Sequence, residues 1–169
     1  MVTNLTAYSN GTLEFNHRQV RAALGKAGTT PAALKREGDG KSPLGAWPVR
    51  YVFYRPDRLP KPETALPVVA LSPDDGWCDD PTRPEYNQHV KLPFPGGHEK
   101  LWRDDHVYDL IVVLGHNDGP IIPGAGSAIF MHLARDNYAG TEGCVALKQE
   151  DLLEFLKLAE PGSAVEIKE

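Results

Sequence analysis

Long apolar runs and clusters of basic residues are both missing from this chain of 169 residues. No apolar run approaches the roughly 20 residues that a membrane-spanning helix needs, which argues against a membrane span. The 18 Lys and Arg residues are outnumbered by 23 Asp and Glu residues and form no block, which argues against nucleic-acid binding. The first residues, MVTNLTAYSNG, lack the basic and apolar regions of a secretory signal. We therefore expect a cytoplasmic protein, or a periplasmic one if the native N-terminus is longer.

Cysteine is also scarce, because the chain has only Cys78 and Cys144. Two cysteines do not make a disulfide framework, and their spacing forbids the CxxC motif that is typical of structural zinc sites. We expect no metal and no cofactor. We interpret Cys78, in GWCDD, as a structural thiol.

Turn-forming residues are abundant instead, with 16 Gly and 15 Pro, more than a helical bundle would tolerate. The length fits one domain, and no repeat or internal boundary divides the chain. We predict a single, mostly β domain over residues 1–169. The sequence does not indicate an oligomeric state.

Strand and turn signals recur along the chain. Asn10-Gly11 between two alternating segments predicts a β-hairpin. Strands are predicted in AWPVRYVFY, PVVALS, VYDLIVVLG, SAIFMHLA and the final PGSAVEIKE, and a helical turn in PAALK. The leucines of QEDLLEFLKLA recur at helical spacing, which predicts the main helix near the C-terminus. Residues 72–97 are interpreted as a long polar loop.

Cys144 stands directly after Gly143, whose backbone can approach a ligand closely. A thiol becomes a nucleophile when a base such as an imidazole takes its proton. Of the six histidines, His116 and His132 lie at or near the ends of apolar strands, and His132 precedes Cys144 by twelve residues. This spacing favours a Cys-His pair, with His116 as the alternative base. Without further features, a buried cysteine and a hydrogen-bonded core histidine remain the competing interpretation.

Two stretches carry a family resemblance. IFMHLARDNYAGTEGCVAL, with His132 followed by Thr141-Glu142-Gly143-Cys144-Val145, resembles the signature of the L,D-transpeptidase (YkuD-like) catalytic domain family. The Ser42-Pro43-Leu44-Gly45 turn in EGDGKSPLGAWPV is similar to the turn that precedes a strand in that family. The resemblance covers roughly residues 35 to 150.

The resemblance implies a β-sandwich-like domain that transfers acyl groups through a cysteine thioester on peptidoglycan stem peptides. It implies that Cys144 is the nucleophile, that His132 is its base, and that a backbone carbonyl orients the histidine. Amides near Gly143 and Cys144 would bind the oxyanion, at about 3 kcal/mol per donor.

The chain also departs from the family pattern. The loop between the histidine and the cysteine is short, and Ala146 stands where the family often has an arginine. We expect Arg103 or Lys41 to supply the missing cation. Further polar contacts to substrate are expected from Thr141, Asn117, Tyr86 and Asn87, and core or cleft-wall positions for Trp77, Trp102 and Tyr108.

Four interpretations of the function are distinguished. Water would resolve the thioester in an L,D-carboxypeptidase that trims the terminal D-Ala from tetrapeptides, with soluble muropeptides as substrates, and we favour this reading. An amine acceptor would make the protein a cross-linking or exchanging L,D-transpeptidase. A non-catalytic peptidoglycan-binding domain would hold an inert thiol, whereas an activated thiolate would be alkylated well below the ordinary thiol pKa of about 8.5. A metal-dependent hydrolase using His116, His132 and Cys144 is a weaker alternative.

Overall fold

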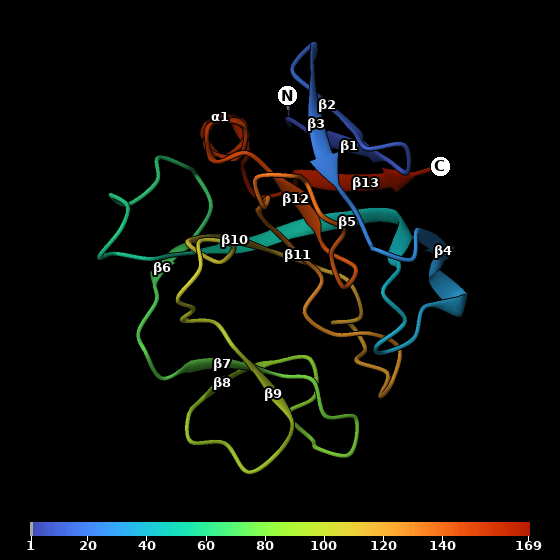
Figure 1. Ribbon diagram of the computed structural model, residues 1–169, viewed down its shortest axis with the longest axis vertical. Helices are drawn as coiled ribbons and strands as arrows, with labels where there is room; N and C mark the ends of the chain where they lie inside the picture. Colours follow the sequence, from blue (N-terminus) through green and yellow to red (C-terminus); the bar gives the residue numbers. More distant parts are fainter. Residues whose placement is uncertain (1) are drawn as a thin grey trace.

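The computed structural model describes residues 2–169 as two β-sheets and one α-helix (Figure 1). The larger sheet contains β1 (Leu5–Tyr8), β2 (Thr12–Phe15), β3 (Arg18–Ala23), β4 (Thr29–Pro31), β5 (Ser42–Tyr54), β6 (Val68–Ala70), β10 (Leu110–Leu114), β11 (Phe130–Leu133), β12 (Val145–Leu147) and β13 (Ala164–Lys168). The smaller sheet contains β7 (Asp75–Cys78), β8 (His89–Lys91) and β9 (His98–Lys100). The helix is α1 (Gln149–Leu158), and a 3-10 turn covers Ala32–Leu34. The mostly β class and the helix near the C-terminus are confirmed. No helix within residues 2–169 is long and apolar enough to cross a membrane.

The larger sheet closes on itself through β5. Its strands pair in the order β10, β11, β12, β3, β2, β1, β13 and β5, and β5 pairs again with β10. The 13 residues of β5 make this possible, because residues 45–48 pair with β13 and residues 49–54 pair with β10. The predicted hairpin is present as antiparallel β1 and β2, with Gly11 at a positive φ of 89° in the turn.

Alternation along the strands separates two hydrophobic cores. Val112 of β10 packs in the first core with Leu152 and Phe155 of α1, whereas its neighbours Ile111 and Val113 pack in the second. The second core lies between β5, β10 and β11 of the larger sheet and the smaller sheet. Because both faces of β10 are covered, the strand is apolar at every position, as the sequence run suggests.

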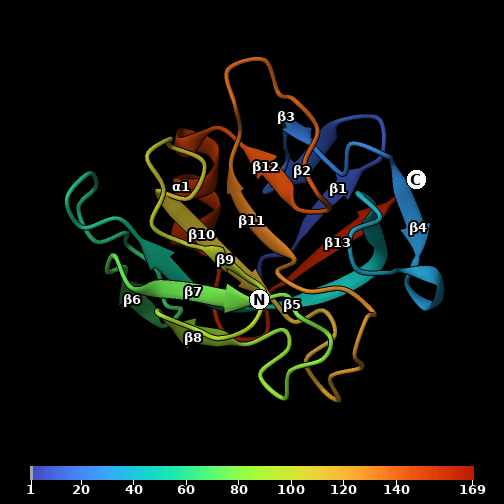
Figure 2. The same cartoon turned by 60° about the horizontal axis from the view of Figure 1, so that its bottom comes forward.

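The smaller sheet corrects the interpretation of residues 72–97 as a loop. β7 pairs antiparallel with both β8 and β9, and Figure 2, with this part turned forward, shows the sheet beside the larger one. Its strands have only three or four residues, too few for a clear alternating pattern. Trp77 of β7 holds it in place, because the indole packs edge-on against Phe130 of β11 at 5.1 Å between ring centroids.

Candidate active site

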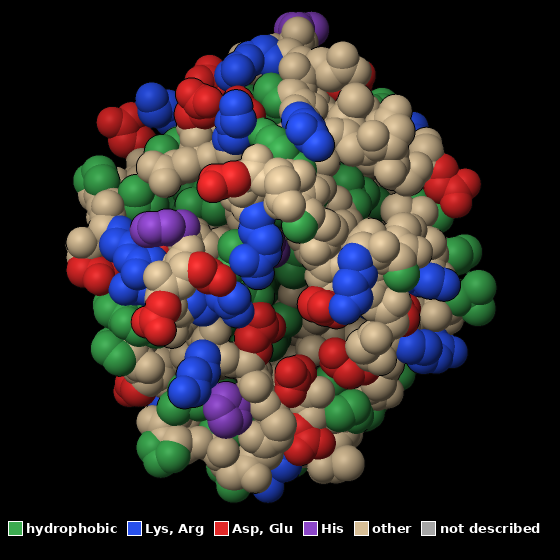
Figure 3. Space-filling view, in the orientation of Figure 1, with side chains coloured by type: hydrophobic (Ala, Val, Ile, Leu, Met, Phe, Trp, Pro, Cys, Tyr) green, Lys and Arg blue, Asp and Glu red, His purple; other side chains and the backbone are tan. Residues whose placement is uncertain are grey.

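His132 and Cys144 are brought together by the parallel pairing of β11 with β12. The register places His132 opposite Ala146, and Cys144 lies two residues before Ala146. Since side chains alternate along a strand, the three share one face of the sheet. All three line a cavity of about 360 Å³, and Figure 3 shows a hollow bordered by acidic and basic side chains on this side of the molecule.

The thiol of Cys144 is almost fully buried, with 6% of the residue exposed. It donates a hydrogen bond to the Ala128 carbonyl at 3.2 Å and accepts one from the Phe130 amide at 3.4 Å. Burial raises the pKa of Cys144 to about 12, because a thiolate would lose its hydration there. The thiol is therefore protonated at neutral pH.

The imidazole of His132 is held by the backbone. Its Nδ1 lies 3.0 Å from the Leu133 carbonyl oxygen, and since a carbonyl can only accept, Nδ1 carries the proton. This leaves the lone pair on Nε2. The ring also packs edge-on against Tyr108 at 5.3 Å. Burial lowers the pKa of His132 to about 4, so the ring is neutral and able to take a proton.

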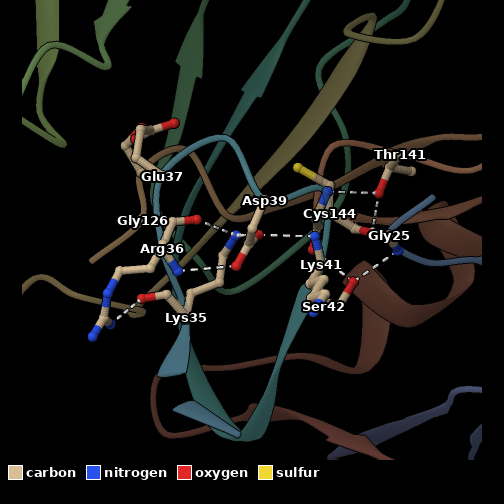
Figure 4. A network of polar contacts seen from close by, with 12 residues as sticks. Gly25, Lys35, Arg36, Glu37, Asp39, Lys41, Ser42, Gly126, Thr141 and Cys144 are labelled. Atoms are coloured by element: carbon tan, nitrogen blue, oxygen red, sulfur yellow. Dashed lines mark hydrogen bonds and ion pairs between the residues drawn. The ribbon is translucent and has the colours of Figure 1, made fainter. Parts of the chain in front are cut away.

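The turn before Cys144 is braced by Thr141 (Figure 4). The Thr141 hydroxyl donates to the Cys144 carbonyl at 2.7 Å and accepts from the Gly143 amide at 3.0 Å. Gly143 has φ +140°, and a Cβ atom there would lie 2.8 Å from the Lys41 carbonyl oxygen, so only glycine fits. The Gly143 amide is thus already engaged, whereas the Cys144 amide makes no hydrogen bond within residues 2–169. Of the two amides expected at the oxyanion, Cys144 N–H is the free one.

Charged side chains of both signs line the cavity. The cations are Lys35, Arg103 and Arg135, and the anions are Glu37, Asp79, Glu99 and Glu142. Arg103 lies in the cavity wall, where Asp105 binds its guanidinium through two contacts of 2.8 and 2.7 Å. Lys41, the other cation considered from sequence, is not among the lining residues.

Two of the charged residues that line the cavity, Lys35 and Glu99, were not predicted from the sequence. Lys35 follows an ordinary helical turn, and nothing in its neighbours distinguishes a buried lysine from an exposed one. Glu99 accepts a hydrogen bond from the Tyr108 hydroxyl, and burial raises the pKa of both groups. Glu99 belongs to the small sheet that the sequence did not reveal.

Three residues predicted to contact substrate, Asn117, Tyr86 and Asn87, are not among the residues that line the cavity. Asn117 binds its own loop, with bonds to the Ile122 backbone and to the Gly126 carbonyl. Tyr86 donates to Glu37 at 2.7 Å and accepts from the Gly126 amide at 3.0 Å. Asn117 and Tyr86 therefore support the loops around the cavity and do not form its surface.

Asn87 connects the smaller sheet to the wall of the site. Its side-chain oxygen accepts from Trp77 Nε1 and from the Ala128 amide, both at 3.0 Å. Its side-chain nitrogen donates to the carbonyls of His116 at 3.1 Å and Asn117 at 2.8 Å. Asn87 therefore positions the backbone of Ala128, and the Ala128 carbonyl in turn accepts the hydrogen bond from the Cys144 thiol.

The aromatic residues divide between the two positions expected for them. Tyr108 lines the cavity, whereas Trp77 is part of the second core. Trp102 also lies away from the cavity lining and packs under the Arg55 guanidinium at 3.6 Å.

His116 does not reach Cys144 or His132. It packs edge-on against Trp47 at 4.8 Å and is not a lining residue. Within residues 2–169 no three His, Cys, Asp or Glu side chains gather in a way that could hold a metal ion. The arrangement therefore does not support the metal-dependent alternative.

A buried cysteine, a histidine oriented by a backbone carbonyl and a free amide beside them are groups that acyl transfer through a cysteine requires. The family model of the L,D-transpeptidase catalytic domain, YkuD, matches residues 2–167, and the chain belongs to this family. Its members are cysteine-dependent enzymes that act on peptidoglycan stem peptides.

The chain is also similar to a solved structure. L,D-transpeptidase 1 of Mycobacterium tuberculosis is similar at 12% identity and a TM-score of 0.45, over 99% of this chain and 62% of that chain. The chain thus spans less than two thirds of that protein. A search of curated proteins finds no match to this sequence.

Proposed function

We propose that the chain is a cysteine L,D-carboxypeptidase that removes the terminal D-Ala from peptidoglycan tetrapeptides through a thioester. The observation that carries the chemistry is the orientation of His132 by the Leu133 carbonyl in the cavity that Cys144 lines. The same observation favours catalysis over a non-catalytic binding domain, because a merely structural thiol needs no oriented base beside it.

Acylation follows from the protonation states of the two groups. His132 Nε2 takes the Cys144 proton as sulfur bonds to the carbonyl carbon between the diamino acid and D-Ala, and the carbonyl π pair moves onto oxygen. The Cys144 amide donates to that oxygen. When the pair returns, the C–N bond breaks and the D-Ala nitrogen takes the proton from the imidazolium.

Deacylation by water uses the same histidine, which again first accepts a proton and then donates it. His132 takes a proton from water, the hydroxyl oxygen bonds to the thioester carbon, and the C–S bond breaks as the proton returns to sulfur. The cavity of about 360 Å³ is partly open to solvent, so water has access to the thioester. The substrate would be a stem peptide, free or on a soluble muropeptide.

Transpeptidation is the second candidate, and the family match favours it. In that case an amine replaces water as the group that resolves the thioester. The expected cytoplasmic location stays a prediction, which cell fractionation would test.

The deciding experiment is mass spectrometry of a disaccharide tetrapeptide incubated with the protein, with and without a D-amino acid, beside Cys144→Ala. Free D-Ala and tripeptide that depend on Cys144 are expected. Exchange of the D-amino acid in excess of tripeptide would replace the carboxypeptidase assignment with the transferase. No turnover of either kind would contradict both.

A further inference from the structure

A buried lysine forms part of the wall beside the nucleophile. Only 3% of the Lys35 side chain is exposed, and it lines the same cavity as Cys144 and His132. Removing an ammonium group from water is costly, so a lysine this buried needs a partner. Asp39 supplies it through an ion pair, and the Arg36 carbonyl accepts a second hydrogen bond at 3.2 Å.

The loop around Asp39 fixes the position of this ammonium (Figure 4). Asp39 also accepts hydrogen bonds from the amides of Arg36 and Lys41, each at 2.9 Å. The next residue, Ser42, donates from its hydroxyl to the Gly143 carbonyl at 2.8 Å. A single short segment thus holds both the ammonium and the turn that carries Cys144.

The ammonium is close to that turn. Lys35 Nζ lies 3.6 Å from the position a Cβ atom would take on Gly143, so the absence of a side chain there leaves the cation next to the backbone. Two acceptors within residues 2–169 bind Nζ, which leaves one of its three N–H groups without a protein partner.

The ion pair is also oriented. Lys35 is a lining residue of the cavity and Asp39 is not, so the pair presents its positive end to the reaction site. The charge of Lys35 opposes the effect of burial on the pKa of Cys144, and it adds to the effect of burial in lowering the pKa of His116.

We propose that Lys35 is a catalytic residue whose ammonium stabilises the negative charge that develops on the substrate carbonyl oxygen when Cys144 attacks. In that step the Cys144 proton moves to His132, sulfur bonds to the carbonyl carbon, and the carbonyl π pair becomes the charge on oxygen. Lys35 and the Cys144 amide share that charge. This role rests on the proposed acyl transfer.

The other two cations that line the cavity, Arg103 and Arg135, are less suited to stabilising the charge on the carbonyl oxygen. Asp105 binds the Arg103 guanidinium through two contacts, and that group also lies over the Tyr108 ring at 5.4 Å, on the side of His132. The side chain of Arg135 is 54% exposed, so water screens its charge.

The test removes the charge of Lys35 together with that of Asp39, which avoids leaving an unpaired carboxylate. Lys35→Met with Asp39→Asn is compared with Lys35→Gln with Asp39→Asn, which keeps polar groups at both positions. The matched control is Lys168→Met with Glu166→Gln, since Lys168 pairs with Glu166 at 3.5 Å away from the cavity. Circular dichroism identifies the folded variants.

Two readouts are taken on each folded variant. Turnover of the tetrapeptide should show kcat lowered about 100-fold with KM changed less than about twofold, because the lost interaction belongs to the transition state. The rate of iodoacetamide labelling of Cys144 at about pH 8, followed on its own peptide to exclude Cys78, should fall, because less thiolate forms without the lysine charge. The control should match the wild type in both.

Unchanged kcat in a folded variant would overturn the proposal, and so would a raised KM with kcat retained, which would make Lys35 a ground-state anchor. The labelling readout does not depend on turnover. An inactive wild type would therefore defeat the proposed function, whereas an unchanged labelling rate of Cys144 in the folded variants would defeat the role of Lys35.

Discussion

The two groups of the proposed catalytic pair, Cys144 and His132, are both neutral in the free protein. Burial raises the pKa of Cys144 to about 12 and lowers that of His132 to about 4, so near neutral pH the proton stays on sulfur. This differs from the activated thiolate that the sequence alone suggests for a Cys-His pair. In the proposed mechanism the proton leaves sulfur only as the bond from sulfur to the carbonyl carbon forms, and the charge that develops on the carbonyl oxygen accepts a hydrogen bond from the Cys144 amide.

A neutral resting pair predicts that turnover and alkylation respond differently to loss of the base. His132→Ala should lower kcat by roughly 100-fold to 10,000-fold, because general base catalysis is lost. Labelling of Cys144 by iodoacetamide should change less than about threefold, since His132 does not ionise the resting thiol.

Labelling of Cys144 is followed on its own peptide, and Cys144→Ala provides the background. A large fall in labelling without His132 would show a resting thiolate-imidazolium pair. That result would contradict the neutral pair.

At the scale of elements, the sequence was most informative where a pattern is long. The apolar run around β10 and the spaced leucines of α1 are periodic over several residues, and both elements lie where they were expected. The smaller sheet was missed because its order comes from distant contacts, such as Trp77 on Phe130, that no local pattern records. Lys35 and Glu99 were missed for the same reason, since their burial depends on segments far away in the chain.

The link between the smaller sheet and the site predicts a cost for changing Asn87. Asn87→Asp keeps the size and the tolerance of the positive φ of 57° but loses the two donated hydrogen bonds. The new carboxyl group would face two carbonyl oxygens while buried. We expect unfolding free energy to fall by about 3 kcal/mol, measured in urea.

Activity should fall in the same variant, because the Ala128 backbone that binds the thiol shifts. Gln88→Glu makes the same chemical change at the next, exposed residue and should leave unfolding within about 0.5 kcal/mol of the wild type. Equal effects of the two substitutions would contradict the linking role.

For the whole molecule, the site depends on how two cores share one set of strands. β5, β10 and β11 pack on both faces, and the cavity lies where the second core meets the end of the closed sheet. The motif around Cys144 predicts a nucleophile and a base. The motif carries no information on the opposite wall of the cavity, which is formed by the smaller sheet and by the segment that contains Lys35.

The same burial makes the fold sensitive to acid. His116 is 5% exposed, and its Nδ1 is buried without a hydrogen-bond partner in residues 2–169. Burial and the charge of Lys35 lower its pKa from 6.5 to about 4. Between these values the unfolded chain binds a proton that the folded protein does not, so stability falls as the pH drops below about 6.5.

His116→Leu should therefore narrow the difference in stability between about pH 7.5 and about pH 5. The wild type should lose on the order of 2 kcal/mol more than the variant over this range, because one proton-linked group is removed. The measurement is urea unfolding at both pH values. His17→Leu, at an exposed histidine, is the control and should keep the wild-type dependence. Parallel losses in the wild type and His116→Leu would show that other groups, such as His132 with its equally lowered pKa, account for the acid sensitivity.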